Sequence, residues 1–217
     1  MQKHSLPVQR TAHYYTLGEP GPHIRRILLA CHGYGQAAER FIHKFSGLDD
    51  GATLVIVPEG LSRFYWGGLD GEVVASWMTR GDRLDEIADY SRYLSQLLDD
   101  YLAKCRPETR LVLLGFSQGC ATIMRWAVQA YPRASHLVFW AGSIPEDIDY
   151  QPHMNYLAGR ELHTFVGDED PFLTPDRLEW HRSMLADKGL RVTEHTFSGK
   201  HTIVREVLEE WFTELQD

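Results

Sequence analysis

The chain has 217 residues, of which 43% are hydrophobic and 24% are charged, a composition typical of one globular α/β domain. Its formal net charge of -8 disfavours nucleic acids and anionic lipid surfaces as partners, because both attract clustered lysine and arginine. No apolar stretch reaches the length of a signal-peptide core or a membrane span. We therefore expect a single domain over residues 1–217, in the cytoplasm and without a stable membrane anchor. The three unpaired cysteines fit reduced thiols.

Apolar runs and helical stripes alternate along the chain. Strands are expected over residues 11–17, 24–31, 52–57, 111–114, 136–140, 162–166 and 191–197. Helices are expected over residues 37–45, from an Asp82 N-cap through an apolar stripe of Leu84 to Leu102, between Ser117 and Tyr131, from Thr174 to Gly189, and from Val204 to Leu215. This alternation predicts an α/β fold with a mostly parallel central sheet and helices on both faces.

One motif indicates a nucleophile. Gly115-Phe116-Ser117-Gln118-Gly119 follows the 111–114 strand directly, with glycines two residues before and two residues after the serine. Small neighbours permit a sharp turn from strand to helix that exposes the serine side chain. The pattern therefore predicts that Ser117 is a catalytic nucleophile at the carboxyl edge of the sheet, where sites in parallel sheets form.

A serine nucleophile needs a base, which is normally a histidine oriented by a carboxylate. In the chain order of α/β hydrolases, the histidine follows the last strand. His201 lies directly after the 191–197 strand and before the last helix, so we expect it to be the base. His195 is the weaker candidate because it lies within that strand.

The acid is expected in the loop that follows the 162–166 strand. That loop reads Gly-Asp-Glu-Asp-Pro, so position alone leaves three candidates, which are Asp168, Glu169 and Asp170. Two of the three must be ordinary solvated or turn residues.

Donors for a negatively charged intermediate are expected at two backbone positions. His32-Gly33-Tyr34-Gly35 follows the 24–31 strand, the place that supplies one amide of an oxyanion hole, and the residue after the nucleophile supplies the other. The amides of Tyr34 and Gln118 are therefore the expected donors. His32 is expected to support the loop rather than to transfer protons. The alternative is a generic glycine-rich turn.

The sequence offers no signature of a cofactor. It contains no His-Glu-x-x-His motif, no paired Cys or His at ligand spacing and no glycine-rich phosphate-binding loop. A serine mechanism needs neither a metal nor another cofactor, and we expect none.

Ser117, Asp170 and His201, together with the motif around Ser117, closely resemble the phospholipase/carboxylesterase family of the α/β-hydrolase superfamily, which includes the acyl-protein thioesterases. The resemblance runs from about Ile27 to the C-terminus, and the Phe-Ser-Gln stretch is its most specific part. It implies that Asp170, which precedes Pro171 as the family's acid does, is the third catalytic residue. It also implies the oxyanion role of the Tyr34 and Gln118 amides.

The chain departs from the family at three places. Gln36 stands where relatives have Asp, Cys120 where they commonly have Gly, and residues 76–79 read Ser-Trp-Met-Thr where relatives often carry Ser-Trp-Phe-Asp. The last of these loops lines the acyl pocket of relatives. A preference for long acyl chains therefore does not follow from the resemblance.

The connection that follows the third strand is unusually aromatic. Phe64, Trp66, Trp77 and Met78 lie in it, and such side chains either pack over the sheet edge or line a cleft. We expect them to line the substrate cleft. Connections on this side of the sheet are too short for a large lid domain, so the site should be open.

Together these features predict a serine carboxylesterase that hydrolyses small or medium acyl esters through an acyl-enzyme intermediate. Its partner would be a small-molecule ester or thioester. An acyl-protein thioesterase or lysophospholipase with the same triad is the first alternative. A non-catalytic ligand-binding homologue is the second, and the oligomeric state is not predicted.

Overall fold

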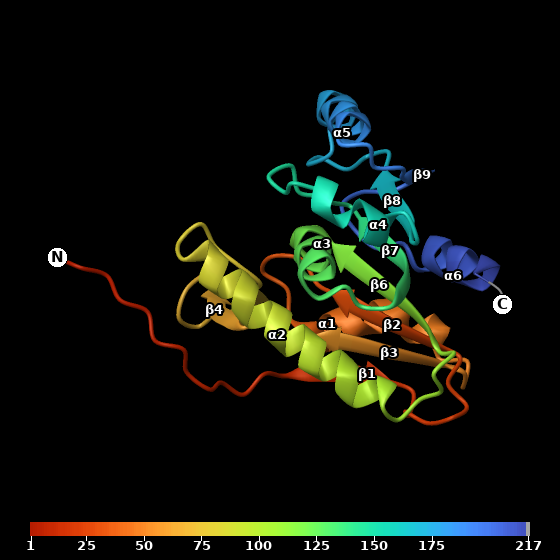
Figure 1. Ribbon diagram of the computed structural model, residues 1–217, viewed down its shortest axis with the longest axis horizontal. Helices are drawn as coiled ribbons and strands as arrows, with labels where there is room; N and C mark the ends of the chain where they lie inside the picture. The colour runs from red at the N-terminus through yellow and green to blue at the C-terminus, as the bar shows by residue number, and fades with distance from the viewer. Residues whose placement is uncertain (216–217) are drawn as a thin grey trace.

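The structure is a computed structural model that describes residues 1–215, and its centre is a seven-stranded sheet (Figure 1). The strand order is β1-β3-β2-β6-β7-β8-β9, in which only the edge strand β1 is antiparallel. The strands are β1 (Tyr14–Leu17), β2 (Arg26–Cys31), β3 (Thr53–Pro58), β6 (Arg110–Phe116), β7 (Ala134–Trp140), β8 (Glu161–Gly167) and β9 (Thr193–Phe197). The predicted mostly parallel sheet is confirmed.

Helices cover both faces of this sheet (Figure 1). One face carries α2 (Arg83–Leu102), α3 (Gln118–Ala130), α4 (Met154–Leu157) and α5 (Pro175–Asp187). The other face carries α1 (Ala38–Phe41), the 3-10 helix η1 (Ile42–Leu48) and α6 (Arg205–Glu214). A second 3-10 helix, η2 (Gln151–His153), precedes α4. The predicted helix over residues 37–45 is thus divided between α1 and η1.

Strand β2 is a continuous apolar run from Ile27 to Cys31, and its packing shows why. Ile27 and Leu29 pack into the core beneath α2 and α3, whereas Leu28 and Ala30 pack into the core beneath η1 and α6. Successive side chains of a strand point to opposite faces, so a strand covered on both faces needs apolar residues at every position.

A hairpin that the sequence reading missed lies outside the main sheet. Strands β4 (Ser62–Trp66) and β5 (Glu72–Ser76) pair antiparallel where only an irregular connection was expected. Gly67 and Gly68 in its turn have positive φ angles of 83° and 116°, which glycine adopts without strain. Neither strand shows a regular alternation of apolar and polar residues, because much of the hairpin is exposed on both faces. The usual period-two signal was therefore absent.

The start of α2 differs from the prediction in two ways. Asp82 precedes the helix with a left-handed φ of 53°, and its side chain accepts no bond from the helix amides. It pairs with Lys3 instead. Leu84 is 79% exposed, so the buried stripe begins at Ile87. The predicted cap and the first residue of the predicted stripe are both wrong. A capping side chain reaches the first helix amides from an extended backbone, and Asp82 is left-handed instead.

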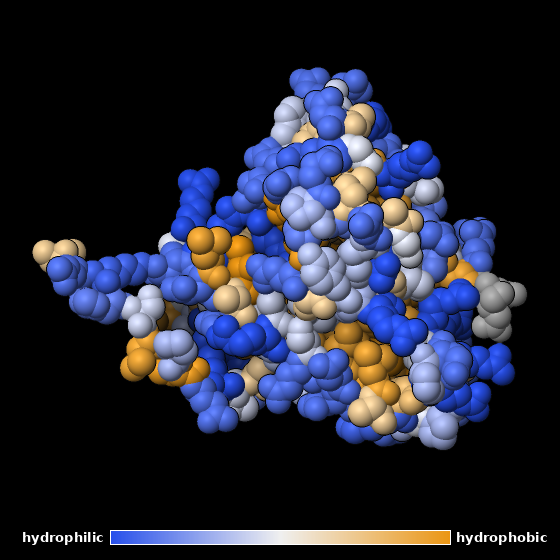
Figure 2. Space-filling view, viewed as in Figure 1, coloured by the Kyte–Doolittle hydropathy of each residue, from blue (hydrophilic) through white to orange (hydrophobic). Residues whose placement is uncertain are grey.

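The surface in the view of Figure 2 is mostly hydrophilic, and its hydrophobic residues form separate groups rather than one continuous band. Within residues 1–215, no helix combines the length and the apolar character that crossing a membrane requires.

Candidate active site

Ser117 lies at the turn from β6 into α3 with φ 53° and ψ -113°. A residue other than glycine in such a conformation costs on the order of 1–3 kcal/mol, so the surroundings must hold it there. The amide of Ser117 donates to the carbonyl of Trp140 at 2.9 Å, and its own carbonyl accepts from the amide of Cys120 at 3.0 Å. The strained turn predicted from the motif is therefore present and is anchored to β7.

The two glycines of the motif are needed because backbone segments approach each other closely. A Cβ added at Gly115 would lie 2.3 Å from the carbonyl oxygen of Gly119, and one added at Gly119 would lie 2.1 Å from that of Cys31. Nonbonded carbon and oxygen atoms do not come this close, so either Cβ would clash with the oxygen it faces. The start of α3 can therefore rest against β2 and β6 only when both positions lack a side chain.

His201 and Asp170, from the loops that follow β9 and β8, are in direct contact. Nδ1 of His201 lies 2.7 Å from Oδ2 of Asp170, whose side chain is fully buried. The other oxygen of Asp170 accepts from the amide of Phe172 at 2.9 Å. Because the carboxylate accepts the proton of Nδ1, Nε2 of His201 is left as a proton acceptor.

Two aromatic rings orient the imidazole of His201. The ring of Phe116, the residue before Ser117, lies 5.0 Å from it between centroids, and the ring of Phe172 lies 4.7 Å away nearly perpendicular to it. The contact with Phe116 brings His201 to the serine turn. The sequence did not predict Phe172 as a residue of the site, because nothing in its local pattern distinguishes it from an ordinary exposed loop residue.

The other two candidate acids, Asp168 and Glu169, form bonds to the backbone of Gly199. The Oδ1 atom of Asp168 accepts from the amide of Gly199 at 2.9 Å, and the amide of Glu169 donates to the carbonyl of Gly199 at 2.9 Å. These bonds join the loop after β8 to the loop after β9. Within residues 1–215, Asp170 is the one of the three candidate acids that contacts His201.

The loop after β2 rests on the serine turn. A Cβ added at Gly33 would lie 3.2 Å from the Cβ of Ser117, and the amide of Gly33 donates to Oε1 of Gln36 at 2.7 Å. Gln36 is thus a structural residue that the sequence reading named only as a departure. No hydrogen bond joins the amide of Tyr34 or of Gln118 to another residue in the described part of the chain. Both amides are therefore free to bind an anionic oxygen.

His32 supports this loop from beneath. It is fully buried, its Nε2 accepts from the amide of Gly60 at 3.0 Å, and its Nδ1 lies 2.7 Å from the carbonyl of Gly33, to which it donates. Desolvation by burial lowers the pKa of His32 to about 4. The imidazole is therefore neutral at physiological pH, and both of its nitrogens serve to hold the loop.

The side chain of Gln118 organises the loop that follows β5. Its Oε1 accepts from the amide of Trp77 at 3.1 Å, and its Nε2 donates to the carbonyl of Met78 at 2.9 Å. Trp77, which we expected to line the cleft, is only 1% exposed, and its Nε1 donates to the carbonyl of His32 at 2.9 Å. The structure places it as a support beneath the site, since its indole packs against the His32 ring. Met78 is partly buried beside it.

Three aromatic rings gather next to the loop after β2. The Tyr34 ring lies 5.3 Å from that of Phe64 and 5.9 Å from that of Trp66 between centroids. Tyr34 and Trp66 are 53% and 54% exposed. The amide of Gly35 donates to the carbonyl of Ala75 at 3.0 Å, so the β4–β5 hairpin is fixed to this loop. We call Tyr34, Phe64 and Trp66 the aromatic cluster.

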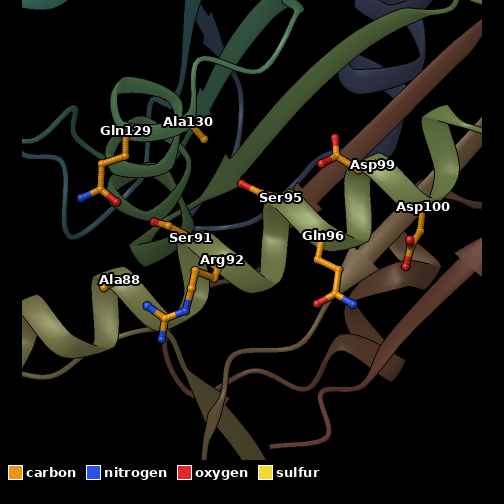
Figure 3. Close-up of a pocket in the computed structure, with 9 residues that line it drawn as sticks. All are labelled: Ala88, Ser91, Arg92, Ser95, Gln96, Asp99, Asp100, Gln129 and Ala130. Atoms are coloured by element: carbon orange, nitrogen blue, oxygen red, sulfur yellow. The ribbon is translucent and has the colours of Figure 1, made fainter. Parts of the chain in front are cut away.

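A depression of about 600 Å³ lies elsewhere, between α2 and the far end of α3 from Ser117 (Figure 3). Its lining is made of small and polar residues, namely Ala88, Ser91, Arg92, Ser95, Gln96, Asp99, Asp100, Gln129 and Ala130. It contains none of the residues of the candidate site.

The model of the phospholipase/carboxylesterase family matches residues 18–216. The chain belongs to this family. It is accordingly a hydrolase that acts on carboxylic ester bonds. A search of curated proteins found no match.

Solved structures share the fold of this chain. Acyl-protein thioesterase 2 from Zea mays has a TM-score of 0.71 at 17% identity, covering 94% of this chain and 99% of that chain. Esterase PE8 has a TM-score of 0.63 at 19% identity, covering 95% of this chain and 100% of that one. A phospholipase/carboxylesterase from Dyadobacter fermentans has a TM-score of 0.60 at 16% identity, covering 94% and 97%. These likenesses show the α/β-hydrolase fold that the sequence predicted.

Proposed function

We propose that the protein is a serine carboxylesterase that hydrolyses small or medium acyl esters through an acyl-enzyme intermediate. In this proposal Ser117 is the nucleophile, His201 is the general base and acid, and Asp170 orients His201. The observation that carries it is the 2.7 Å hydrogen bond from His201 to a buried Asp170, with the imidazole against the residue that precedes the strained serine.

The reaction proceeds in two halves. Nε2 of His201 takes the proton of the Ser117 hydroxyl as its oxygen attacks the ester carbonyl, and the imidazolium returns that proton to the leaving alcohol. Asp170 stabilises the imidazolium. Water, deprotonated by the same imidazole, then attacks the acyl carbonyl; the bond from this carbon to the Ser117 oxygen breaks, the imidazolium returns its proton to that oxygen, and the acid leaves.

The anionic oxygen of each tetrahedral intermediate accepts from the amides of Tyr34 and Gln118. Both lack another acceptor among residues 1–215, and the Gly33 backbone beside them lies against Ser117. Donors of this kind each contribute about 2.7–4 kcal/mol to transition-state stabilisation.

The aromatic cluster is the proposed contact for the apolar part of the substrate. It stands next to the Tyr34 amide, and two of its three rings are about half exposed. Each CH₂ group that a surface covers contributes about 0.8 kcal/mol to binding. An open apolar surface covers only a short stretch of an acyl chain, so it favours acyl groups of small or medium size. Met78 is the proposed lower wall, with Trp77 as its support.

The identity of the nucleophile is tested with Ser117→Ala and the matched exposed control Ser46→Ala. We expect Ser117→Ala to lose both ester hydrolysis and labelling by a fluorophosphonate probe, and the control to retain both. Full labelling of the Ser117→Ala protein would show that another residue is the nucleophile.

The roles of the two nearby aspartates are separated with Asp170→Asn and Asp168→Asn. We expect Asp170→Asn to lower kcat by up to about 10⁴-fold, because an amide can neither fix the Nδ1–H tautomer of His201 nor stabilise its positive charge. Asp168→Asn keeps an oxygen that can accept from Gly199, so kcat should fall far less. Equal losses in the two variants would overturn the assignment of Asp170.

His201 is tested by substitution. Without the imidazole no base accepts the serine proton, so His201→Ala should leave almost no activity. Undiminished hydrolysis by that variant would exclude His201 as the base.

The substrate class is tested with esters of graded acyl length, the matching thioesters and a lysophospholipid at equal concentrations. We expect the highest kcat/KM for short and medium esters. Trp66→Ala should raise KM for the medium esters, whereas Tyr65→Ala, on the other face of the same strand, should not. Thioesters or lysophospholipids as the best substrates would instead assign a thioesterase or lysophospholipase, and a single turnover with retained ligand would indicate a binding protein.

A further inference from the structure

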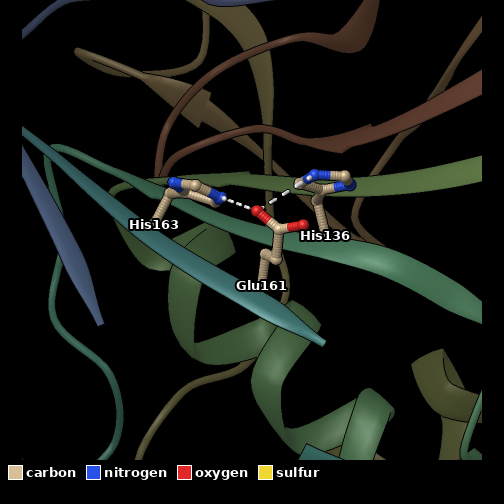
Figure 4. Close-up of side chains that lie close together, drawn as sticks. All are labelled: His136, Glu161 and His163. Carbon is tan, nitrogen blue, oxygen red and sulfur yellow. Dashed lines mark ion pairs between the residues drawn. The ribbon is translucent and has the colours of Figure 1, made fainter. Parts of the chain in front are cut away.

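Two histidines and a glutamate meet on the face of the sheet that α6 covers, near the amino ends of β7 and β8 (Figure 4). His136 and Glu161 are direct partners in the parallel register, and His163 lies two residues after Glu161 on the same face. Each residue offers a ligand atom within 4.8 Å of the others. Ser117 lies at the opposite, carboxyl edge of the sheet, so this cluster is separate from the candidate active site.

The nitrogen of His136 that faces Glu161 carries a lone pair. The hydroxyl of Ser135 donates its one proton to the carbonyl of Leu111 at 3.0 Å, so its 2.8 Å contact with Nδ1 of His136 requires Nδ1–H to be the donor. Nε2 is then unprotonated in the neutral ring. It lies 3.7 Å from Oε2 of Glu161, a distance too long for a hydrogen bond.

His163 directs its Nε2 at the same carboxylate. Its Nδ1 lies 3.1 Å from Nε2 of His195, whereas its Nε2 is buried without a hydrogen-bond partner among the described residues and lies 3.7 Å from Oε2 of Glu161. The side chain is 9% exposed. A buried nitrogen without a partner is rare and requires an explanation. Here it points at the same carboxylate oxygen as His136, as the dashed lines of Figure 4 show.

A cation explains this convergence. Ligating histidines usually engage their second nitrogen in a hydrogen bond, which fixes the ring and leaves the other nitrogen for the metal. Bond lengths of 2.0–2.2 Å in a tetrahedral zinc site place ligand atoms about 3.4 Å apart, a few tenths less than the 3.7 Å separations here. Glu161 is 70% exposed, so its flexible side chain can close the two Glu–His separations and leaves one side open to water. The ligand nitrogens of the two histidines lie within 4.8 Å of each other, and the rings would move together when a metal binds.

We propose that His136, Glu161 and His163 bind a divalent transition metal, zinc above all, with water as the fourth ligand. The indole of Trp211 on α6 packs against both imidazoles, with centroids 6.0 Å and 5.2 Å away. The metal would therefore join β7 to β8 beneath α6 and act on stability. The sequence reading found no ligand spacing because one histidine comes from a different strand, and only the β7–β8 register brings it to the other two residues.

The test is a zinc titration of the full chain after dialysis against a chelator, followed by competition with a chromophoric chelator. We expect one zinc per chain. Glu161→Gln, which changes an exposed side chain and leaves the core intact, should weaken zinc binding by at least about 10-fold, the lower end of losses seen even for residues that only support ligands. His163→Gln should do the same, and the exposed control His43→Gln should bind zinc as the unmodified chain does.

Two further measurements report on the site itself. Zinc should raise the unfolding temperature of the unmodified chain and of His43→Gln, because binding to the folded state alone stabilises it, and should not raise that of Glu161→Gln. Nitrogen-15 NMR should show zinc shifting Nε2 of His136 and His163. An unmodified chain without saturable zinc binding, or a Glu161→Gln variant that binds zinc as tightly, would overturn the proposal.

Discussion

Acid is expected to destabilise the loop that carries Tyr34, through protonation of His32. This imidazole is fully buried, and both of its nitrogens are already used in the neutral form, with Nε2 accepting from the amide of Gly60 and Nδ1 donating to the carbonyl of Gly33. A second proton would have to reside on Nε2, where it would face the Gly60 N–H. Burial is the main cause of the low pKa of His32, about 4.

The expected magnitude follows from the difference between the folded and unfolded proteins. The pKa of His32 falls from 6.5 to about 4 on folding, so the unfolded chain binds more protons in this window and stability decreases as the pH falls through it. The folding stability lost in this way amounts to about 3 kcal/mol once the pH is below both pKa values. About 2 kcal/mol of this loss falls between pH 7 and pH 5.

The assay compares the unmodified chain with His32→Gln in urea unfolding monitored by tryptophan fluorescence. Glutamine can still accept from Gly60 but does not titrate. The difference between their free energies of unfolding should therefore shrink by about 2 kcal/mol from pH 7 to pH 5. Other buried histidines titrate in both proteins and cancel. A difference that stays constant over this range would refute the reasoning.

Three substitutions test the packing around the site by the same unfolding assay. Gly119→Ala should cost at least about 1–3 kcal/mol and lower ester hydrolysis, because its Cβ would lie 2.1 Å from the carbonyl oxygen of Cys31; unchanged stability would contradict the close approach. Trp77→Phe should cost about 1–3 kcal/mol, because the buried carbonyl of His32 loses its indole donor; a loss of activity with full stability would instead point to direct substrate contact. Thr174→Ala should cost about 0.5–2 kcal/mol through the lost cap of α5, whereas a neutral change would mean that its 3.4 Å bond is not formed in solution.

Much of the fold followed from local patterns. Residues 27–31 and 111–114 are apolar at every position, which only a strand covered on both faces requires, and both runs lie inside the sheet. The glycines around Ser117 predicted the strained turn, because a positive φ and a close backbone contact each restrict what can stand there. The order of serine, acid and histidine along the chain placed the other loops.

Errors arose where the local pattern has two physical solutions. An aspartate before a helix normally caps it, but Asp82 takes a left-handed conformation and pairs with Lys3. Aromatic residues in a connection can be exposed or buried, and neighbouring positions here include both, since Trp66 is 54% exposed and Trp77 is 1% exposed. The indole N–H of Trp77 can be buried because it donates to the buried carbonyl of His32. The local sequence does not show whether such an acceptor exists.

By itself, the sequence determined the seven strands of the main sheet, most of the helices, the serine turn and the order of the candidate catalytic residues, because burial and backbone conformation leave periodic and local marks in a chain. Position along the chain left Asp168 and Asp170 open and the family resemblance implied Asp170, but only the tertiary structure shows the contact of His201 with Asp170 and the pairing of His136 with Glu161. Such contacts join residues far apart in sequence. They depend on strand register and on the direction of a single side chain, and neither of these leaves a local pattern from which it could be read.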